Sequence, residues 1–201
     1  METLTKEIQA SIRPNDAVMR LKEGNRRFLQ NKKTERDLLS QVDKTGSGQF
    51  PFAALLSCID SRVPAELVFD QGIGDIFNVR VAGNIVNEDI LGSLEYSCKV
   101  AGSKLVLVLG HTRCGAVTSA CKHVELGNIT PLLEKIQPAV GSVVKGDLTP
   151  EIIEEVAVKN VENSIEQIRK DSPILKEMED NGEIVIAGAI YDVASGAVEF
   201  L

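Results

Sequence analysis

The stretch KLVLVLGH, residues 104–111, decides the fold, because five successive aliphatic residues precede its glycine. A strand that is apolar on both faces is typical of the interior of a parallel sheet, where helices cover each side. Three other runs have the length and composition of strands, at residues 52–58, 76–83 and 183–191, and residues 197–201 form a short final one. We therefore predict an α/β fold with a mostly parallel central β-sheet flanked by helices.

Segments with helical signals alternate with these strands. Pro64 opens a short helix at its favoured first position, and Asn87 is placed to cap another. The longer predicted helices span residues 15–30, 87–100, 113–126 and, interrupted by four prolines, 130–180.

The polar, glycine-dotted segment 31–49 reads as a surface connection between the first helix and the first strand. We therefore divide the chain into an N-terminal helical arm with its connection, residues 1–48, and a single α/β domain, residues 49–201. A chain of 201 residues is long enough to bury a core without disulfides.

Composition narrows the possible partners. With 22 basic and 29 acidic residues the formal charge is −7, which argues against a nucleic-acid surface. No apolar run approaches the roughly 20 residues of a membrane span, and the opening METLTKEIQA lacks the apolar middle of a signal peptide. We expect no nucleic-acid or membrane partner, and a cytoplasmic location provided that no leader peptide has been removed.

Three metal-ligating side chains follow two of the predicted strands. Cys58 ends one strand, while His111 and Cys114 occupy the turn after another. Ligands of open α/β sheets bind beyond the carboxyl ends of the strands, so we expect these three groups to meet there. Two thiolates and an imidazole suit zinc, and three protein ligands leave the open position of a catalytic site.

The alternatives to a metal site are ordinary packing roles. A buried cysteine after a strand is common, a histidine can be a satisfied core residue, and one His-x-x-Cys pair is weak evidence. Cys121 lies seven residues after Cys114 on the same predicted helix, about 10 Å away, too far to share a zinc ion. Cys98 is not at a strand end, so we expect both to be core residues. His123, the second of only two histidines, is expected in the last turn of its helix.

Two motifs together resemble the β-class carbonic anhydrases. They are CIDSRVPAE at residues 58–66 and GHTRCGAV at 110–117, supported by NVRVAGN at 78–84 and GSLEYS at 92–97. The similarity extends from residue 15 to the C-terminus. It implies reversible hydration of carbon dioxide to bicarbonate and a proton, with one zinc ion per chain held by Cys58, His111 and Cys114. It also implies a homodimer or a tetramer of dimers, with the N-terminal helix packed over a partner subunit.

The resemblance also gives a role to Asp60 and Arg62. In an extended chain, Cys58, Asp60 and Arg62 would share one face and converge. Asp60 would accept a hydrogen bond from the zinc-bound water or hydroxide and orient it, while Arg62 holds the carboxylate as a bidentate donor. Released by Arg62, Asp60 could become a conditional fourth zinc ligand in a closed form.

The carbon dioxide pocket is implied by the resemblance alone. It would consist of five residues: Gln49, Phe77, Ala82, Gly83 and Tyr96. From the sequence by itself, Phe77 and Tyr96 read as core residues.

Two alternative functions remain open. A carbonyl sulfide or carbon disulfide hydrolase would use the same zinc and the same Asp–Arg pair. A non-catalytic zinc-binding regulatory protein of this fold would be expected to lack that pair.

Overall fold

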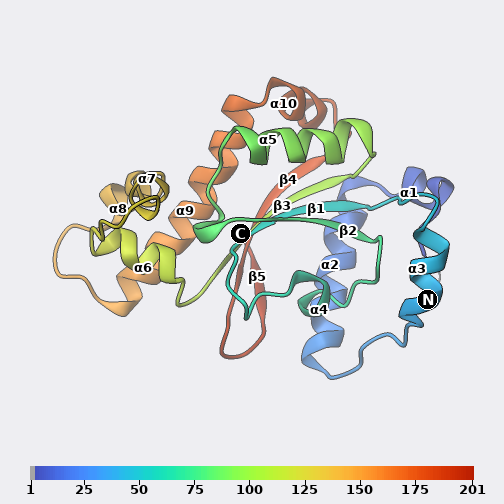
Figure 1. Cartoon of the computed structure of the whole chain (residues 1–201), viewed down its shortest axis with the longest axis horizontal. Helices are drawn as coiled ribbons and strands as arrows, with labels where there is room; N and C mark the ends of the chain where they lie inside the picture. Colours follow the sequence, from blue (N-terminus) through green and yellow to red (C-terminus); the bar gives the residue numbers. More distant parts are fainter. Residues whose placement is uncertain (1–2) are drawn as a thin grey trace.

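The computed structural model describes residues 3–201 and contains a five-stranded sheet in the order β2-β1-β3-β4-β5 (Figure 1). Four strands are parallel and the last is antiparallel to its neighbour. They are β1 (Ala53–Ser57), β2 (Ile76–Arg80), β3 (Leu105–His111), β4 (Val185–Tyr191) and β5 (Val198–Phe200). The predicted α/β class with a mostly parallel sheet is confirmed.

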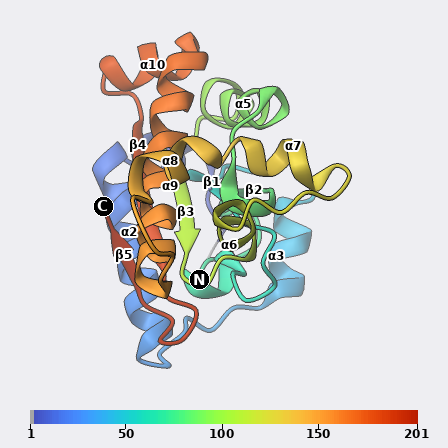
Figure 2. The ribbon, with the colours of Figure 1, turned by 90° about the vertical axis from the view of Figure 1, so that its left-hand side faces the viewer.

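Helices cover both faces of the sheet (Figure 1). One face carries α2 (Pro14–Leu29) and α4 (Ala65–Val68), and the other carries α5 (Glu88–Glu95), α9 (Pro150–Asp171) and α10 (Pro173–Asp180). At one end of the molecule lie α6 (Gly115–Cys121), α7 (Ile129–Glu134) and α8 (Gln137–Val143), which face the viewer in Figure 2. The remaining elements are α1 (Lys6–Ser11), α3 (Leu38–Thr45), the 3₁₀ turn η1 (Ala82–Asn84) and the π-helical turn η2 (Tyr96–Val100). Among residues 3–201, no helix combines the length and apolarity needed to cross a membrane.

The central strands are apolar throughout because each of their faces meets a helical layer. In β3, Leu105, Leu107 and Leu109 join the core on the α2 side of the sheet. Val106 and Val108 join the core on the α9 side. All seven residues of this strand are buried, which is the environment that its sequence predicts.

One predicted helix ends where expected and another ends early. Asn87 caps α5 by accepting from the Ile90 amide at 2.9 Å, as predicted, and the helix continues as a π-helical turn to Val100. By contrast, α6 ends at Cys121 because His123 has a left-handed backbone with φ 51°. His123 therefore follows its helix and does not lie in the last turn.

The segment predicted as a surface connection contains a helix, α3. Its start is capped by Asp37, whose carboxylate accepts from the Ser40 amide at 3.0 Å. The helix has no apolar stripe facing the core, since its one buried residue is Gln41 while Leu39 is 81% exposed. Leu38, Leu39 and Val42 do fall on one side of the helix, but that side is exposed in the described chain.

The expected N-terminal helical arm is present, but α2 packs on the sheet of its own chain. Ala17 and Leu21 are fully buried in the core on that face. At Gly24 a Cβ atom would lie 1.8 Å from the Phe69 carbonyl oxygen, so only glycine permits this close approach. The expectation that this helix also packs over a partner subunit stays a prediction. The boundary at residue 48 stays a prediction.

One side chain of α2 connects the two ends of the chain. The Asn25 amide donates to the Val68 carbonyl at 3.1 Å and to the Gly196 carbonyl at 3.0 Å. Its oxygen accepts from the Val198 amide at 3.0 Å, at the start of β5. The buried Asn25 therefore fastens α2 to the last hairpin of the fold.

A buried ion-pair cluster holds the chain between α2 and α3 against the end of α4. Asp70 is 3% exposed and pairs with Arg27 at 2.6 Å and with Arg36 at 2.5 Å, while the Thr34 hydroxyl donates at 2.8 Å. Burial opposes ionisation of this carboxyl, but these hydrogen bonds outweigh it and lower the pKa of Asp70 to about 2.

We expect Asp70→Asn to lower the free energy of unfolding by about 3 kcal/mol at pH 7, since it leaves two guanidinium groups without their anion. Because the folded-state pKa is depressed, the stabilisation from Asp70 is present above the unfolded value near 4. It is lost as the pH falls through about 2. Denaturant unfolding between pH 2 and pH 7 measures both effects.

The control for this prediction is Asp16→Asn, which removes the exposed pair with Arg13 and should change little. Equal stability of Asp70→Asn and the wild type at pH 7 would contradict the role given to the cluster.

Candidate metal centre

The structure brings the three predicted ligands together at one end of the sheet. Cys58 follows β1, His111 is the last residue of β3, and Cys114 immediately precedes α6. Their two sulfur atoms and an imidazole nitrogen all lie within 4.8 Å of one another, and all three residues are buried. Zinc bonds of about 2.1–2.3 Å place ligand atoms roughly 3.5–4 Å apart in a tetrahedral site. Small side-chain adjustments are therefore enough for these three groups to share one ion.

The hydrogen bonding of His111 fits a metal ligand. Its Nδ1 lies 2.9 Å from the Thr112 carbonyl oxygen, which can only accept, so Nδ1 carries the proton. The Nε2 atom then presents a lone pair, and it is buried without a hydrogen-bond partner among the described residues. An imidazole fixed in this way by a backbone carbonyl is the usual arrangement of a metal-ligating histidine.

The two cysteines already share a stabilised negative charge. A hydrogen bond from the Cys114 thiol holds the pKa of Cys58 well below its usual range, and the same interaction raises the pKa of Cys114. The Gly83 amide adds a further donor, 3.4 Å from Cys58 Sγ. The thiolate form is the one that binds a metal, so this environment favours ligation by Cys58, whereas Cys114 would give up its proton as a metal binds.

Asp60 and Arg62 form a bidentate ion pair at the edge of the site. Arg62 Nε donates to Asp60 Oδ1 at 2.9 Å and Nη2 to Oδ2 at 2.7 Å. The hydrogen bonds from this guanidinium lower the pKa of Asp60 to about 2, so the carboxylate is ionised at neutral pH. Asp60 Oδ2 lies 3.9 Å from His111 Nε2, which places the carboxylate beside the three ligands.

The backbone geometry behind this pair differs from the expected extended chain. The Arg62 amide donates to Asp60 Oδ1 at 2.9 Å, and the Val63 amide donates to the Asp60 carbonyl at 3.0 Å. The two residues therefore meet in a turn closed by the aspartate side chain, a local preference of aspartate, and not through strand alternation.

Three hydrogen bonds, two from Arg80 and one from Arg113, hold the segments that carry the site. Arg80 Nε donates to the Cys58 carbonyl at 2.9 Å, and its Nη2 donates to the Asp60 carbonyl at 2.6 Å. Arg113, which has φ 55°, donates its amide to the Glu154 carboxylate of α9 at 2.8 Å. Glu154 belongs to no motif, and no local pattern in the sequence points to it, because the contact joins residues 41 positions apart.

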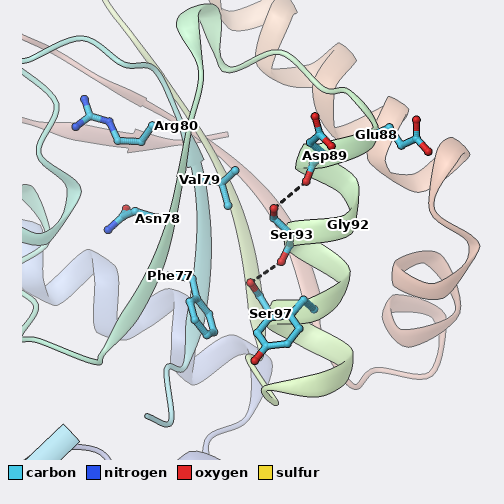
Figure 3. Close-up of a pocket in the computed structure, with 10 residues that line it drawn as sticks. Phe77, Asn78, Val79, Arg80, Glu88, Asp89, Gly92, Ser93 and Ser97 are labelled. Atoms are coloured by element: carbon cyan, nitrogen blue, oxygen red, sulfur yellow. Dashed lines mark hydrogen bonds between the residues drawn. The ribbon is translucent and has the colours of Figure 1, made fainter. Parts of the chain in front are cut away.

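The five predicted pocket residues do not line one cavity. Phe77 lines the groove between β2 and the α5–η2 helix (Figure 3). Tyr96 lines the same groove, and the two ring centroids are 6.4 Å apart. In that view Asn78 and Arg80 point to the opposite side of β2. Gln49 lies in a separate depression formed with residues 45–48.

Ala82 and Gly83 are the pocket residues that lie beside the metal ligands. Gly83 donates to the Cys58 sulfur, and Ala82 lines an apolar groove of about 630 Å³. That groove includes Ile59 and Gly115, the residues that follow two of the ligands. The groove therefore lies beside the ligand cluster, although none of the three candidate ligands lines it.

Comparison with known proteins agrees with this geometry. The family model described as carbonic anhydrase matches residues 53–198. Carbonic anhydrase 2 of Mycobacterium tuberculosis is 33% identical over 183 residues, which cover 88% of this chain and 87% of the relative. The chain belongs to the carbonic anhydrase family, and the predicted enzyme class is confirmed by this membership.

Solved structures place the chain in the β-class. The β-carbonic anhydrase CafA of Aspergillus fumigatus is 25% identical, with a TM-score of 0.73 over 93% of this chain and 89% of that chain. The tetrameric β-carbonic anhydrases of Sordaria macrospora share the fold, with a TM-score of 0.72, 21% identity and coverage of 81% and 89%. The resemblance to the β-class is therefore confirmed.

Proposed function

We propose that the protein catalyses the zinc-dependent, reversible hydration of carbon dioxide to bicarbonate and a proton. The observation that carries the proposal is the buried Cys58–His111–Cys114 group, whose unpartnered His111 Nε2 lies beside the Asp60 carboxylate. Membership of the carbonic anhydrase family supports it.

In this proposal Cys58, His111 and Cys114 hold one zinc ion per chain. Zinc, when bound, acts as a Lewis acid that lowers the pKa of water toward about 7 and so supplies hydroxide near neutral pH. The ionised Asp60 can only accept hydrogen bonds, so it would orient the attacking oxygen by accepting a hydrogen bond from it, which turns a lone pair of that oxygen toward the carbon. The proton lost from water leaves to solvent as bicarbonate forms.

Arg62 keeps Asp60 in this orienting position. Its two donors hold the carboxylate, and Nη2 also lies 3.3 Å from the Arg113 carbonyl, which ties the guanidinium to the turn between two ligands. Asp60 can reach the metal only when this pair opens, so we retain it as a conditional fourth ligand of a closed form.

Stopped-flow measurement of carbon dioxide hydration tests the function directly. We expect hydration with the zinc-loaded protein, loss of it with a strong chelator and recovery on adding zinc. Parallel assays with carbonyl sulfide and carbon disulfide separate the two alternatives. Turnover of only the sulfur compounds would replace the proposed substrate, and full zinc binding without any turnover would indicate a regulatory protein.

We further propose that a second copy of the chain completes the carbon dioxide pocket. Phe77 and Tyr96 lie at the β2 edge of the sheet, and Tyr96 is 56% exposed in the single chain. Gln49 likewise lies away from the ligands of its own chain. These positions support a homodimer, or a tetramer of dimers, in which each metal centre faces the β2 edge of its partner.

We expect sedimentation at micromolar concentration to show a dimer or a tetramer, because each pocket needs both subunits. A folded and active monomer of 21.8 kDa would contradict the assembly.

Co-expression provides a sharper check of the shared pocket. Asp60→Asn and Tyr96→Ala, each poorly active alone, should together recover about a quarter of wild-type activity, since half of the dimers then hold one intact site. A chain that carries both changes, expressed alone, should recover none of the activity.

The cytoplasmic location stays a prediction that cell fractionation tests.

A further inference from the structure

Helix α9 carries polar side chains within the stripe that it packs against the core. Asn160 is 3% exposed and Ser164 is 5% exposed, and they lie among Val156, Val161 and Ile165. A buried amide in apolar surroundings costs free energy unless its hydrogen bonds are made. The contacts of Asn160 therefore indicate the role of this buried amide.

Both polar side chains of α9 reach the turn η1. Asn160 Nδ2 donates to the Gly83 carbonyl oxygen at 2.8 Å, and Ser164 Oγ donates to the Asn84 carbonyl oxygen at 3.2 Å. Gly83 and Asn84 both have left-handed backbones, with φ 68° and 43°. Glycine and asparagine are the residues that adopt this region at least cost, so the local sequence permits the turn and the two bonds from α9 hold it in place.

The turn η1 also contacts a ligand of the candidate metal centre. The Gly83 amide donates to Cys58 Sγ at 3.4 Å. A Cβ atom on Gly83 would lie 2.7 Å from Ile136 Cδ1 and 3.2 Å from Ala116 Cβ, so the peptide is confined on its other side as well. Asn160 and Cys58 therefore contact the same residue, one through its carbonyl and the other through its amide.

We infer that Asn160 is a positioning residue for Cys58, which holds Gly83 so that its amide points at the ligand sulfur. The inference rests on the proposed zinc site. Two thiolates donate much charge to a metal, and an N–H bond to one of them draws part of that charge back. Asn160 thus acts on the affinity and the electronic character of the site without touching the ion.

The competing account is that Asn160 only fastens α9 to the turn. Ser164 supplies a matched control, because it makes the same kind of bond to the next carbonyl, whose residue makes no bond to a ligand sulfur. A fastening role predicts similar effects from both positions, whereas the positioning role predicts an effect on the metal from Asn160 alone.

The experiment compares Asn160→Leu, which keeps the approximate shape and removes the donor, with Ser164→Ala. Three quantities are measured: thermal stability, zinc affinity by chelator competition, and the thiolate-to-metal charge-transfer absorption of the cobalt-substituted proteins. We expect Asn160→Leu to weaken zinc binding by about 10- to 100-fold and to shift the charge-transfer band. Ser164→Ala should leave the zinc affinity within about twofold and the band position unchanged, whatever its thermal stability.

Wild-type zinc affinity and band position in Asn160→Leu would overturn the inference, as would equal changes in Ser164→Ala. If Asn160→Leu does not fold, Asn160→Ala and the cadmium-113-substituted wild-type protein replace it. In the latter the Gly83 amide proton should couple to the metal through Cys58 Sγ, and absence of this coupling would also overturn the inference. Failure of the proposed function shows separately, as a wild-type protein without zinc or without hydration activity.

Discussion

Cys58→Ser and His111→Ala are each expected to lose bound zinc and to reduce carbon dioxide hydration to the uncatalysed background. Either change leaves two ligands of the three that the fold brings together. Removal of a group that merely supports a ligand typically costs 10- to 100-fold in metal affinity, so loss of a ligand should exceed about 100-fold. Elemental analysis after dialysis, together with stopped-flow assay, measures both losses.

The matched controls are the two cysteines outside the cluster. Cys98 is 2% exposed, and burial raises the pKa of its thiol to about 12, so it remains protonated. Cys98→Ser and Cys121→Ser should therefore retain one zinc per chain and lose only stability. Full zinc content in Cys58→Ser and His111→Ala would exclude the assigned site.

Asp60→Asn is expected to keep its zinc while hydration falls by about 10²–10³-fold, the usual effect of removing one oriented group from a reacting centre. The amide can offer its N–H₂ where the carboxylate only accepts, so the attacking oxygen is no longer held with a lone pair toward carbon. Arg62→Ala should also be poorly active, because it frees Asp60 to move toward the metal.

Asp16→Asn controls for the loss of any aspartate–arginine pair, since Asp16 and Arg13 form such a pair on the surface. It should retain wild-type rates. If Asp60→Asn hydrates carbon dioxide at the wild-type rate, the carboxylate has no part in the reaction.

The strands and the cluster of candidate metal ligands could be predicted because both are encoded locally. The run at Leu105–His111 is apolar on both faces, and an interior parallel strand buries both faces at once. His111 and Cys114 then follow that strand directly, and Cys58 follows its neighbour. Strands β1 and β3 are parallel neighbours, so their carboxyl ends lie together. This places Cys58 next to His111 and Cys114.

The parts that escaped prediction depend on contacts between distant residues. The docking of α2 on its own sheet is decided by Gly24 and Asn25, which meet partners 43 or more positions away. The hydrogen bond from Asn160 to Gly83 spans 77 positions, and its sequence neighbours look like an ordinary amphipathic helix. The Asp60–Arg62 pair was expected for a wrong geometric reason, because the turn that forms it depends on aspartate chemistry and not on strand alternation.

The hydrogen bonds of Asn25 affect the order in which parts of the chain are secured during synthesis. The residues that Asn25 joins to α2 are Gly196 and Val198, 171 and 173 positions further on. During synthesis these partners are made after β1–β4, long after α2 itself. Helix α2 is therefore made early and secured late, and until β5 is added its apolar side has only part of its final cover.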